Sequence, residues 1–516
     1  MTLKENRNYW LVAALFVVTK LLAHLFTNTQ FELHRDEMLY FNMSDYPAFG
    51  YASVPPVIGF LALIVKGTFG FSVFGIRLIP ALLGAASVFI MAKIIKELGG
   101  GVPALVIASV SFLLSPGFLI FDTLFTPNVV EQFLWLLIIY FIFRMTNTNN
   151  PKYWITIGIL IGVAFMNKYS VLFLFVGFFV SLLFSKYRKL LSSRYLFFAI
   201  VAGFVIFLPN ILWQYWHNWP VFHHMEELNK TQMVNMRFGN FLLDLFSLNL
   251  LVSIIWIIGL ISALVFKDEK KYRYIGIATL IIIVFFVISK GKAYYLMGLF
   301  PFMMAFGAYT LEKYLTEKKR VITYILISLI AISGLIVLPF SLPVLSFQSL
   351  EKYAERTGNL KIYPFYRWED GKVHPVSQVY ADMTGWKEMT ANVSKAWQML
   401  SDEEKKTCTI FAEENYGYAG AVHFYGKEYD LKDAITFHDS YTLWAPDSVP
   451  NGTFIYINTK LEDIKELFAD ITKVGSVNNK YFRENGLSVY ICRSPKTDVS
   501  NIYKQLAIKY KSLYHK

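Results

Sequence analysis

The chain has 516 residues, of which 55% are hydrophobic and only 17% are charged. A soluble protein of this length carries more charge and shorter apolar runs, so the composition excludes that class and predicts a polytopic α-helical membrane protein. The formal net charge of +12 does not indicate nucleic-acid binding, because the basic residues lie in short clusters between apolar segments, as cytoplasmic loops do.

Long apolar segments run through the first 343 residues. About eleven of them reach or approach the roughly 17–25 residues that a helix needs to cross a bilayer. We read the first as a retained span, because no small-residue cleavage site follows it. Residues 57–65 are also apolar, but the run is brief and follows Pro55-Pro56, which favours an interfacial or re-entrant helix. The predicted spans are 9–27, 76–96, 102–121, 127–144, 152–167, 169–185, 195–213, 247–266, 272–289, 293–312 and 321–343.

The distribution of Lys and Arg sets the orientation. With the N-terminus in the cytoplasm, these spans place the basic clusters at 186–194, 267–273 and 313–320 on the cytoplasmic side, as the positive-inside rule requires. Counting residues 57–65 as a span would move all three clusters outside. The topology therefore predicts an external first loop over residues 28–75. It divides the chain into a membrane-embedded domain, 1–343, and an extracytoplasmic domain, 344–516.

The C-terminal part predicts a small α/β domain. Strand-like runs occur at 408–412, 453–458 and 487–492, with helix-like stretches near 386–400, 415–424 and 461–472 between them. The last twenty or so residues read as a basic helix that either lies on a membrane surface or is solvated. Cys408 and Cys492 are the only cysteines, and they predict either one disulfide or two free thiols.

The first external loop carries the sequence His34-Arg35-Asp36-Glu37, followed by Tyr40. Adjacent carboxylates diverge by about 100° on a helix, so one can act as a base while the other positions a substrate or holds the helix end. Partial desolvation beside lipid predicts a raised carboxyl pKa, as a general base needs. The alternative is a loop carboxylate that merely pairs with Arg35 or His34.

Further ionisable residues lie at predicted external ends of spans. Asp122 follows a long apolar span and either faces a cavity or partner or caps the next helix. Lys168, Lys290 and Lys292 break the positive-inside pattern. Beside Tyr295 they suit an anionic lipid headgroup such as a phosphate, or they snorkel toward ordinary anionic lipid. Arg77, at the start of the second span, is a weaker member of this set.

The segment 213–224 contains three Trp and three His. His217, His223 and His224 suggest a metal site, but an aromatic belt at the membrane interface is the favoured interpretation. The sequence contains no Walker loop, GxSxG elbow or CxxC motif, and therefore gives no support to nucleotide hydrolysis, serine hydrolysis or structural zinc.

Five features follow one another along the membrane half of the chain: HRDEMLY (34–40), GYASVPPVIGFLA (50–62), FGIRLIPALLGA (74–85), Asp122 with Lys168, and GKAYYLMGLFPFMM (291–304). In this order they resemble the bacterial membrane glycosyltransferases of the GT-C class that are related to protein O-mannosyltransferases and to the aminoarabinose transferase of lipid A. The resemblance covers roughly residues 1–340. Segments 380–389, 412–426 and 438–446 also resemble a tail domain found in a bacterial subset of this family.

The resemblance implies a hexosyl or pentosyl transferase of the bacterial inner membrane, acting on its extracytoplasmic face with a polyprenyl-phosphate-linked sugar as donor. The acceptor would be a hydroxyl of lipid A, of an envelope glycan or of a protein. Membrane lipids are implied as partners and nucleic acid is not. The resemblance implies no required cofactor and leaves a divalent metal open.

The resemblance also implies a role for each candidate residue. Asp36 would be the general base, while Glu37 and Asp122 would orient acceptor and donor sugar. Tyr40 and Tyr51 would help to position the substrate. The ligands of the donor phosphate would be Lys168, Lys292, Lys290, Arg77 and Tyr295. Met297-Gly298 stands where the family usually has Leu-Pro, so the match to the family is weaker at this point.

Two other functions are compatible with the chain. A transporter or flippase for a lipid-linked anion would place ionisable groups near the middle of the membrane on broken helices, whereas here they gather at one face. A non-catalytic relative that only binds polyprenyl lipids would not need the intact Asp36-Glu37 pair. The sequence therefore favours the transferase.

Overall fold

The structure, a computed structural model, describes residues 3–231, 238–315, 320–358, 366–368, 370–462 and 464–514. The chain forms two compact units. The first comprises Met1–Asn28, Arg77–Asn210 and Leu228–Ser346, and the second comprises Thr29–Ile76, Ile211–Glu227 and Phe347–Lys516. The second unit thus contains the first loop, which was predicted to be external, as well as the C-terminal part. The sequence had placed that loop in the membrane-embedded domain.

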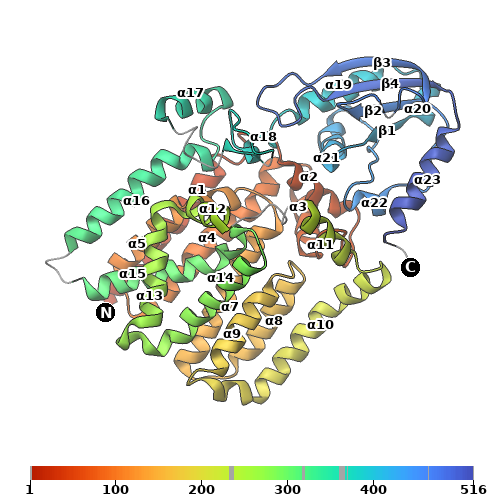
Figure 1. Cartoon of the computed structure of the whole chain (residues 1–516). Helices are drawn as coiled ribbons and strands as arrows, with labels where there is room; N and C mark the ends of the chain where they lie inside the picture. The colour runs from red at the N-terminus through yellow and green to blue at the C-terminus, as the bar shows by residue number, and fades with distance from the viewer. Residues whose placement is uncertain are drawn as a thin grey trace. The chain divides into compact units, whose positions relative to one another are not determined.

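The first unit is a bundle of helices (Figure 1). All eleven apolar segments are helical, and the third breaks at Ser115-Pro116 into two helices. The helices are α1 (Leu3–Leu25), α4 (Val73–Leu98), α5 (Val102–Leu114), α6 (Pro116–Phe121), α7 (Pro127–Thr148), α8 (Tyr153–Phe165), α9 (Val171–Leu183), α10 (Arg194–Trp216), α12 (Phe238–Asn249), α13 (Ser253–Val265), α14 (Arg273–Ile288), α15 (Phe300–Tyr314) and α16 (Arg320–Ser341).

Within the described ranges, eight helical stretches are long and apolar enough to cross a membrane, and α3 (Val57–Phe69), α5, α8 and α9 are shorter apolar helices. The number of crossings predicted from the sequence, about eleven, stays a prediction. Large apolar side chains cover much of the outer surface: Leu15 on α1 is 62% exposed and Phe197 on α10 is 65% exposed. Such a surface suits lipid and not water.

Glycines allow the bundle helices to pack closely. A Cβ atom on Gly307 of α15 would overlap the carbonyl of Ile255 on α13, and one on Gly259 of α13 would overlap the carbonyl of Met303. Gly158 and Gly162 of α8 lie four residues apart and face the backbone of α10. Small residues at this spacing let backbones approach where the hydrophobic effect does not drive helices together.

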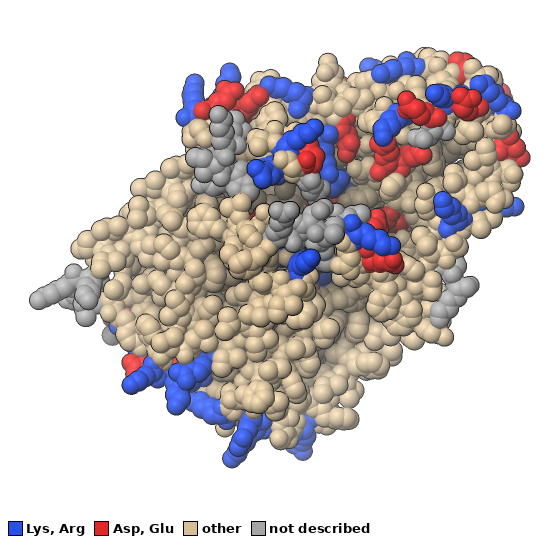
Figure 2. All heavy atoms as spheres, viewed as in Figure 1, with Lys and Arg blue, Asp and Glu red and all other residues tan. Residues whose placement is uncertain are grey.

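The basic clusters meet at one end of this bundle. The ring of Tyr187, which follows α9, lies edge-on to that of Tyr274 on α14, with ring centroids 5.3 Å apart. The Tyr274 hydroxyl forms a hydrogen bond of 2.7 Å with the Thr146 hydroxyl on α7. Lys313 of α15 pairs with Glu269 at 2.6 Å. Figure 2 shows Lys and Arg side chains gathered at the lower end of these helices, with a broad uncharged surface beside them. The predicted cytoplasmic loops are therefore neighbours.

The second unit contains a mixed four-stranded sheet with strand order β1-β2-β4-β3 (Figure 1). Strands β1 and β2 are parallel, and the other two pairs are antiparallel. The strands are β1 (Thr409–Ala412), β2 (Phe454–Asn458), β3 (Phe468–Ser476) and β4 (Ser488–Pro495), and the helices are α2 (Arg35–Asn42), α3, α11 (Pro220–Thr231), α17 (Phe347–Thr357), α18 (Gln378–Ala381), α19 (Trp386–Gln398), α20 (Asp402–Thr407), α21 (Tyr416–Tyr425), α22 (Tyr441–Trp444) and α23 (Val499–Lys511).

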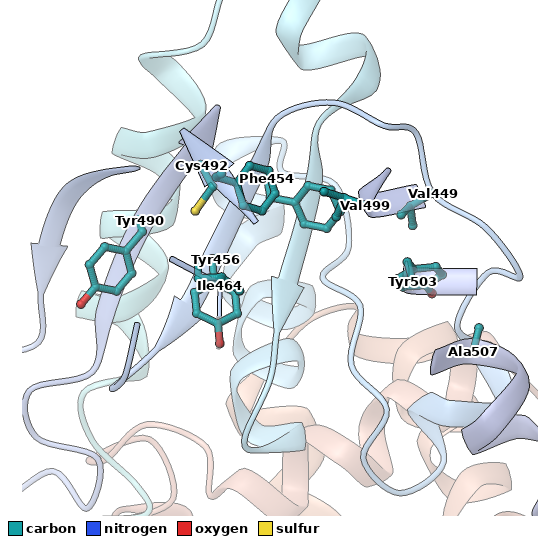
Figure 3. Close-up of a cluster of buried hydrophobic side chains, with 10 residues drawn as sticks. Val449, Phe454, Tyr456, Ile464, Tyr490, Cys492, Val499, Tyr503 and Ala507 are labelled. Carbon is teal, nitrogen blue, oxygen red and sulfur yellow. The ribbon is translucent and has the colours of Figure 1, made fainter. Parts of the chain in front are cut away.

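Helices cover both faces of this sheet. On one face Phe454 pairs across the strands with Cys492, and Tyr456 pairs with Tyr490. Figure 3 shows these side chains with others of the same core. Helix α23 contributes Val499, Tyr503 and Ala507 to that core, spaced four residues apart on one side of the helix. Helix α19 packs on β3 and β4 with its own buried side. Burial on both faces explains the continuous apolar run in β2.

Most predicted elements of the C-terminal part are present, with one error. The three predicted strands and the helices at 386–400 and 415–424 are confirmed. The predicted helix at 461–472 is wrong, because residues 468–476 form strand β3 beside β4. Cys408 and Cys492 are free, buried thiols, and burial raises the pKa of each to about 12. Residues 57–69 form the predicted short helix, and its interfacial position stays a prediction.

Candidate active site in the first loop

Helix α2 begins with a capping box that uses the His34–Glu37 motif. His34 is the N-cap, and its ring nitrogen Nδ1 accepts from the backbone N–H of Asp36 at 3.1 Å. The Glu37 Oε2 atom accepts from the backbone N–H of His34 at 2.9 Å. Glu37 is fully buried. It therefore holds the helix end, one of the two roles that its sequence allowed.

Asp36 is the half-buried carboxylate of the pair, with 32% of its side chain exposed. Its Oδ1 atom accepts a hydrogen bond of 2.6 Å from the Tyr416 hydroxyl. The Nε atom of Arg35 lies 3.6 Å from Oδ1, and the Nδ1 atom of His34 lies 3.8 Å from Oδ2. The contacts with Arg35 and His34 anticipated as the alternative interpretation are thus present, together with a tyrosine from the C-terminal part.

The pKa of Asp36 is lowered, not raised as the sequence suggested. Burial raises this pKa, but the charges of His34 and Arg35 and the hydrogen bond from Tyr416 outweigh burial. The prediction considered desolvation alone, and the cationic neighbours correct it. Asp36 is consequently ionised at neutral pH, which is the state that accepts a proton.

A second carboxylate organises the cations around Asp36. The Oδ2 atom of Asp382 lies 3.5 Å from Arg35 Nε and 3.1 Å from the Nη1 atom of Arg483. It also lies 3.6 Å from the Nε2 atom of His34. Asp382 is itself buried. Fixed in this way, the Arg35 guanidinium keeps positive charge close to Asp36.

Tyr40 and Tyr51 both lie in this unit but have different environments. Tyr40 is half-buried on α2. Tyr51 is buried, and its hydroxyl donates to the carbonyls of Met43 and Tyr46, each at 3.2 Å. The Tyr51 side chain thus fastens the chain that follows α2, and its substrate-positioning role stays a prediction.

Asp122 lies in the first unit, at the end of α6. Its Oδ2 atom is 2.7 Å from the Nζ atom of Lys20 on α1, and the two side chains are 3% and 1% exposed. Lys20 also donates to the Phe118 carbonyl at 3.0 Å. Asp122 does not cap α7, whose N-cap residue is Thr126. The structure gives Asp122 a buried partner, which the sequence analysis had not identified.

Lys168 also has a partner in the first unit. Its Nζ atom lies 2.8 Å from the Glu131 carboxylate and donates to Asn128 at 2.7 Å. The Tyr295 ring centroid is 4.1 Å from the same atom, and that of Tyr294 is 5.4 Å away. The predicted neighbours Lys168 and Tyr295 are therefore brought together, with Glu131 as an addition.

The other predicted phosphate ligands, Lys292, Lys290 and Arg77, have three different environments within the first unit. Lys292 is half-buried, with its Nζ atom 6.0 Å from the Tyr294 ring centroid. Lys290 is exposed and has a left-handed backbone with φ of 54°. Arg77 is fully buried and donates to the Asn28 carbonyl at 2.7 Å. Gly298 packs against Trp135, where a larger residue would not fit.

The histidines of segment 213–224 are arranged in the second unit without an obvious metal centre. The His217 ring stacks on Trp213 at 4.1 Å, and His223 contacts Asn218 at 3.5 Å. Over the described parts of the chain, no group of three or more His, Cys, Asp or Glu side chains is placed to hold a metal ion.

Known proteins of related sequence or fold show what this chain is similar to. Residues 53–213 match the family model described as dolichyl-phosphate-mannose-protein mannosyltransferase. The fold is similar to that of ArnT from Cupriavidus metallidurans. The crystal structure of that protein bound to undecaprenyl phosphate has a TM-score of 0.62 at 13% identity, covering 93% of this chain and 98% of that one. The apo structure gives a TM-score of 0.63 at 14% identity, covering 94% and 98%.

The resemblance to GT-C glycosyltransferases of the PMT and ArnT type is confirmed. The lipid A galacturonosyltransferase RgtD of Rhizobium johnstonii is 25% identical over 199 residues, which is 37% of this chain and 41% of that protein. The matched stretch therefore spans about two-fifths of RgtD. Among the GT-C features, the GY…PP segment from Ser53 onward, Arg77, Asp122 and Lys168 lie within the family match, and HRDEMLY lies before it.

Sequence reasoning missed several residues that shape these candidate sites. Tyr416, Asp382 and Arg483 all come from the C-terminal part and reach the first loop only in the folded chain. The first two lie in segments that resemble the tail domain of some relatives, which is the one available signal. Lys20 and Glu131 could have been found from the sequence, because each lies within a predicted apolar span. An ionisable residue inside such a span needs a partner of opposite charge.

Proposed function

We propose that the protein is a membrane glycosyltransferase that transfers a sugar from a polyprenyl-phosphate donor to an acceptor hydroxyl on the extracytoplasmic face. The observation that carries this proposal is the Asp36 carboxylate, which is partly exposed, ionised and held at the start of α2 in the first loop. The ArnT-like fold over 93% of the chain supports the same reaction class.

In the proposed reaction, Asp36 takes the proton of the acceptor hydroxyl as the acceptor oxygen bonds to the anomeric carbon of the sugar. The bond between that carbon and the donor phosphate oxygen breaks, and polyprenyl phosphate leaves with the bonding electron pair. Attack from the opposite side inverts the anomeric centre. A phosphate is already a fair leaving group, so positioning and charge stabilisation account for most of the catalysis.

The lipid phosphate is the ligand we propose for Lys168, supported by Tyr295 and Lys292, with Lys290 and Arg77 as weaker candidates. Lys168 is paired with Glu131, so phosphate binding there requires Glu131 to exchange that contact. Asp122 is proposed to orient the donor sugar, in which case it must act while bound to Lys20. Glu37 contributes through the helix end that it holds.

Among the candidate acceptors, a lipid has the support of the relatives. RgtD is described as a lipid A galacturonosyltransferase, and one ArnT structure contains undecaprenyl phosphate. We therefore propose an undecaprenyl-type donor and a lipid A-like acceptor. Protein and other envelope glycans are the alternative acceptors.

The test is transfer of label by the purified full-length protein. Radiolabelled undecaprenyl-phosphate sugars are supplied with membrane extract as the acceptor source, and Asp36→Asn is compared with wild type. We expect a loss of at least about 100-fold, since general-base catalysis typically contributes 10²–10⁴-fold. Asp402→Asn, which changes an exposed carboxylate on α20, is the matched control. Transfer by Asp36→Asn at the wild-type rate would refute the base assignment.

Transport is the alternative function, and the same material distinguishes it. A flippase would carry the labelled lipid across vesicles without transferring its sugar, and its rate would not depend on an acceptor. Reporter fusions at residues 190, 270 and 345 test the orientation independently. A cytoplasmic location for residue 345 would contradict the extracytoplasmic site.

A further inference from the structure

We infer that Tyr416, on α21 of the C-terminal part, is a positioning residue for the Asp36 carboxylate, so that this part of the chain completes the candidate active site. The inference rests on the proposed role of Asp36 as general base. It gives a function to the tail segments, which the sequence analysis left without one.

The hydrogen bond from Tyr416 distinguishes the two oxygens of Asp36. Oδ1 accepts from the tyrosine hydroxyl at 2.6 Å. Oδ2 has a contact of 3.8 Å with His34, which is beyond hydrogen-bonding distance, and among the described residues it accepts no hydrogen bond. With Oδ1 occupied, the carboxylate cannot rotate freely. Oδ2 is then the oxygen left to accept a proton from an acceptor hydroxyl.

Close packing of α2 on α21 holds the tyrosine in place. Helix α21 packs against α2 (Figure 1). Two glycines on α21, Gly417 and Gly420, face α2. A Cβ on Gly417 would lie 3.0 Å from the Arg35 side chain, and one on Gly420 would lie 2.9 Å from that of Met38. Larger residues at either position would push the helices apart and lengthen the bond to Asp36.

Further hydrogen bonds fasten the C-terminal part to the first loop on both sides of α2. Before the helix, the backbone N–H of Leu33 donates to the Tyr425 hydroxyl at 2.8 Å, and Glu32 accepts from the backbone of Trp386 at 2.7 Å. At the end of the helix, the Asn42 amide bonds to the Tyr441 hydroxyl. Tyr416 is therefore held within a fixed interface, which a positioning residue requires.

The groups that face Asp36 come from three elements. His34 and Arg35 belong to its own segment, Tyr416 to α21, and Arg483 to the loop before β4. Asp382 pairs with Arg35 and Arg483. A hydrogen bond to the charged form of a carboxylate lowers its pKa. Replacing Tyr416 by Phe removes that bond and leaves the cations, so the pKa of Asp36 should rise.

The experiment measures protonation of Asp36 directly in the full-length protein. A water-soluble carbodiimide with glycine ethyl ester labels protonated carboxyls, and peptide mass spectrometry follows labelling of Asp36 as pH is varied. In Tyr416→Phe we expect the midpoint to move up by about one pH unit. Tyr503→Phe is the matched control, because its hydroxyl donates to the Pro446 carbonyl elsewhere in the same domain. Its midpoint should equal that of wild type.

Transfer activity adds the catalytic readout. The acid limb of kcat/KM for Tyr416→Phe should move with the labelling midpoint, and Tyr503→Phe should retain the wild-type profile. An unchanged midpoint in Tyr416→Phe overturns the inference, even if Asp36→Asn abolishes transfer. A shifted midpoint together with full activity in Asp36→Asn overturns the proposed function and leaves the Tyr416 contact intact. A melting temperature within a few degrees of wild type excludes misfolding as the cause of either shift.

Discussion

The buried pair between Lys20 and Asp122 makes a quantitative prediction about stability. Their charged atoms are 2.7 Å apart, and neither side chain is more than 3% exposed. Replacing Lys20 by Met preserves the length of the side chain but leaves the Asp122 carboxylate without its countercharge. Breaking a buried pair from one side destabilises a protein by roughly 3–5 kcal/mol, because the remaining charge stays desolvated.

Thermal unfolding in detergent, followed by loss of the monodisperse size-exclusion peak, measures this effect. An unfolding entropy of about 2.1 cal/mol/K per residue gives about 1 °C per kcal/mol for a chain of 516 residues. For Lys20→Met we therefore expect the apparent melting temperature to fall by about 3–5 °C. The double variant Lys20→Met, Asp122→Asn should recover at least half of that loss, because the unpaired charge is gone. Lys4→Met, on an exposed part of the same helix, is the control and should not change the midpoint.

Two outcomes would refute this reasoning. If Lys20→Met melts at the wild-type temperature, the pair does not contribute to folding as the geometry requires. If the double variant is as unstable as the single variant, the loss comes from packing of the Lys20 stem and not from the charge left on Asp122.

Two further predictions concern the second unit. Glu37→Gln should keep the capping box and most of the activity, whereas Glu37→Ala should lose about 1 kcal/mol of stability and much of the activity; equal loss in both variants would indicate that the charge of Glu37 is needed. His423 lies 2.8 Å from Asp45 and 3.0 Å from Asp433. Burial lowers the pKa of His423, but these two carboxylates raise it overall. The stabilisation from its charge is complete below the unfolded pKa of about 6.5 and is lost as pH rises through the folded pKa. The melting temperature of wild type should therefore exceed that of His423→Gln by less and less between about pH 6 and pH 9. A constant difference would contradict this prediction.

The helical segments were predictable because the required length is a property of the bilayer. Each apolar run from 9–27 to 321–343 contains a helix, since backbone groups in lipid must bond within their own segment. The strand at 468–476 was not predictable in this way. Its preceding residues carry Glu462, Lys465 and Glu466 at helical spacing, and only pairing with β4 selects the extended form.

The Asp36-Glu37 pair was found from its sequence, but the roles of its two members separate only in the structure. Glu37 is assigned to the helix end by one hydrogen bond to His34. Asp36 is partly exposed and accepts a hydrogen bond from Tyr416. Tyr416 lies 380 residues further along the chain, so no local sequence pattern could predict this contact. The pKa of Asp36 was predicted in the wrong direction for the same reason, because its sign depends on cations that distant contacts hold in place.

The separation of Asp36 from Tyr416 has a consequence for biosynthesis. A ribosome adds about 5–20 residues per second, so the 380 residues between them correspond to roughly 20–80 seconds of translation. Throughout that interval the nascent first loop has left the ribosome, while the helix that packs on it does not yet exist. Asp36 thus stays without Tyr416 until the chain is nearly complete, and a polypeptide released early carries the Asp-Glu motif without the contacts that surround it in the folded chain.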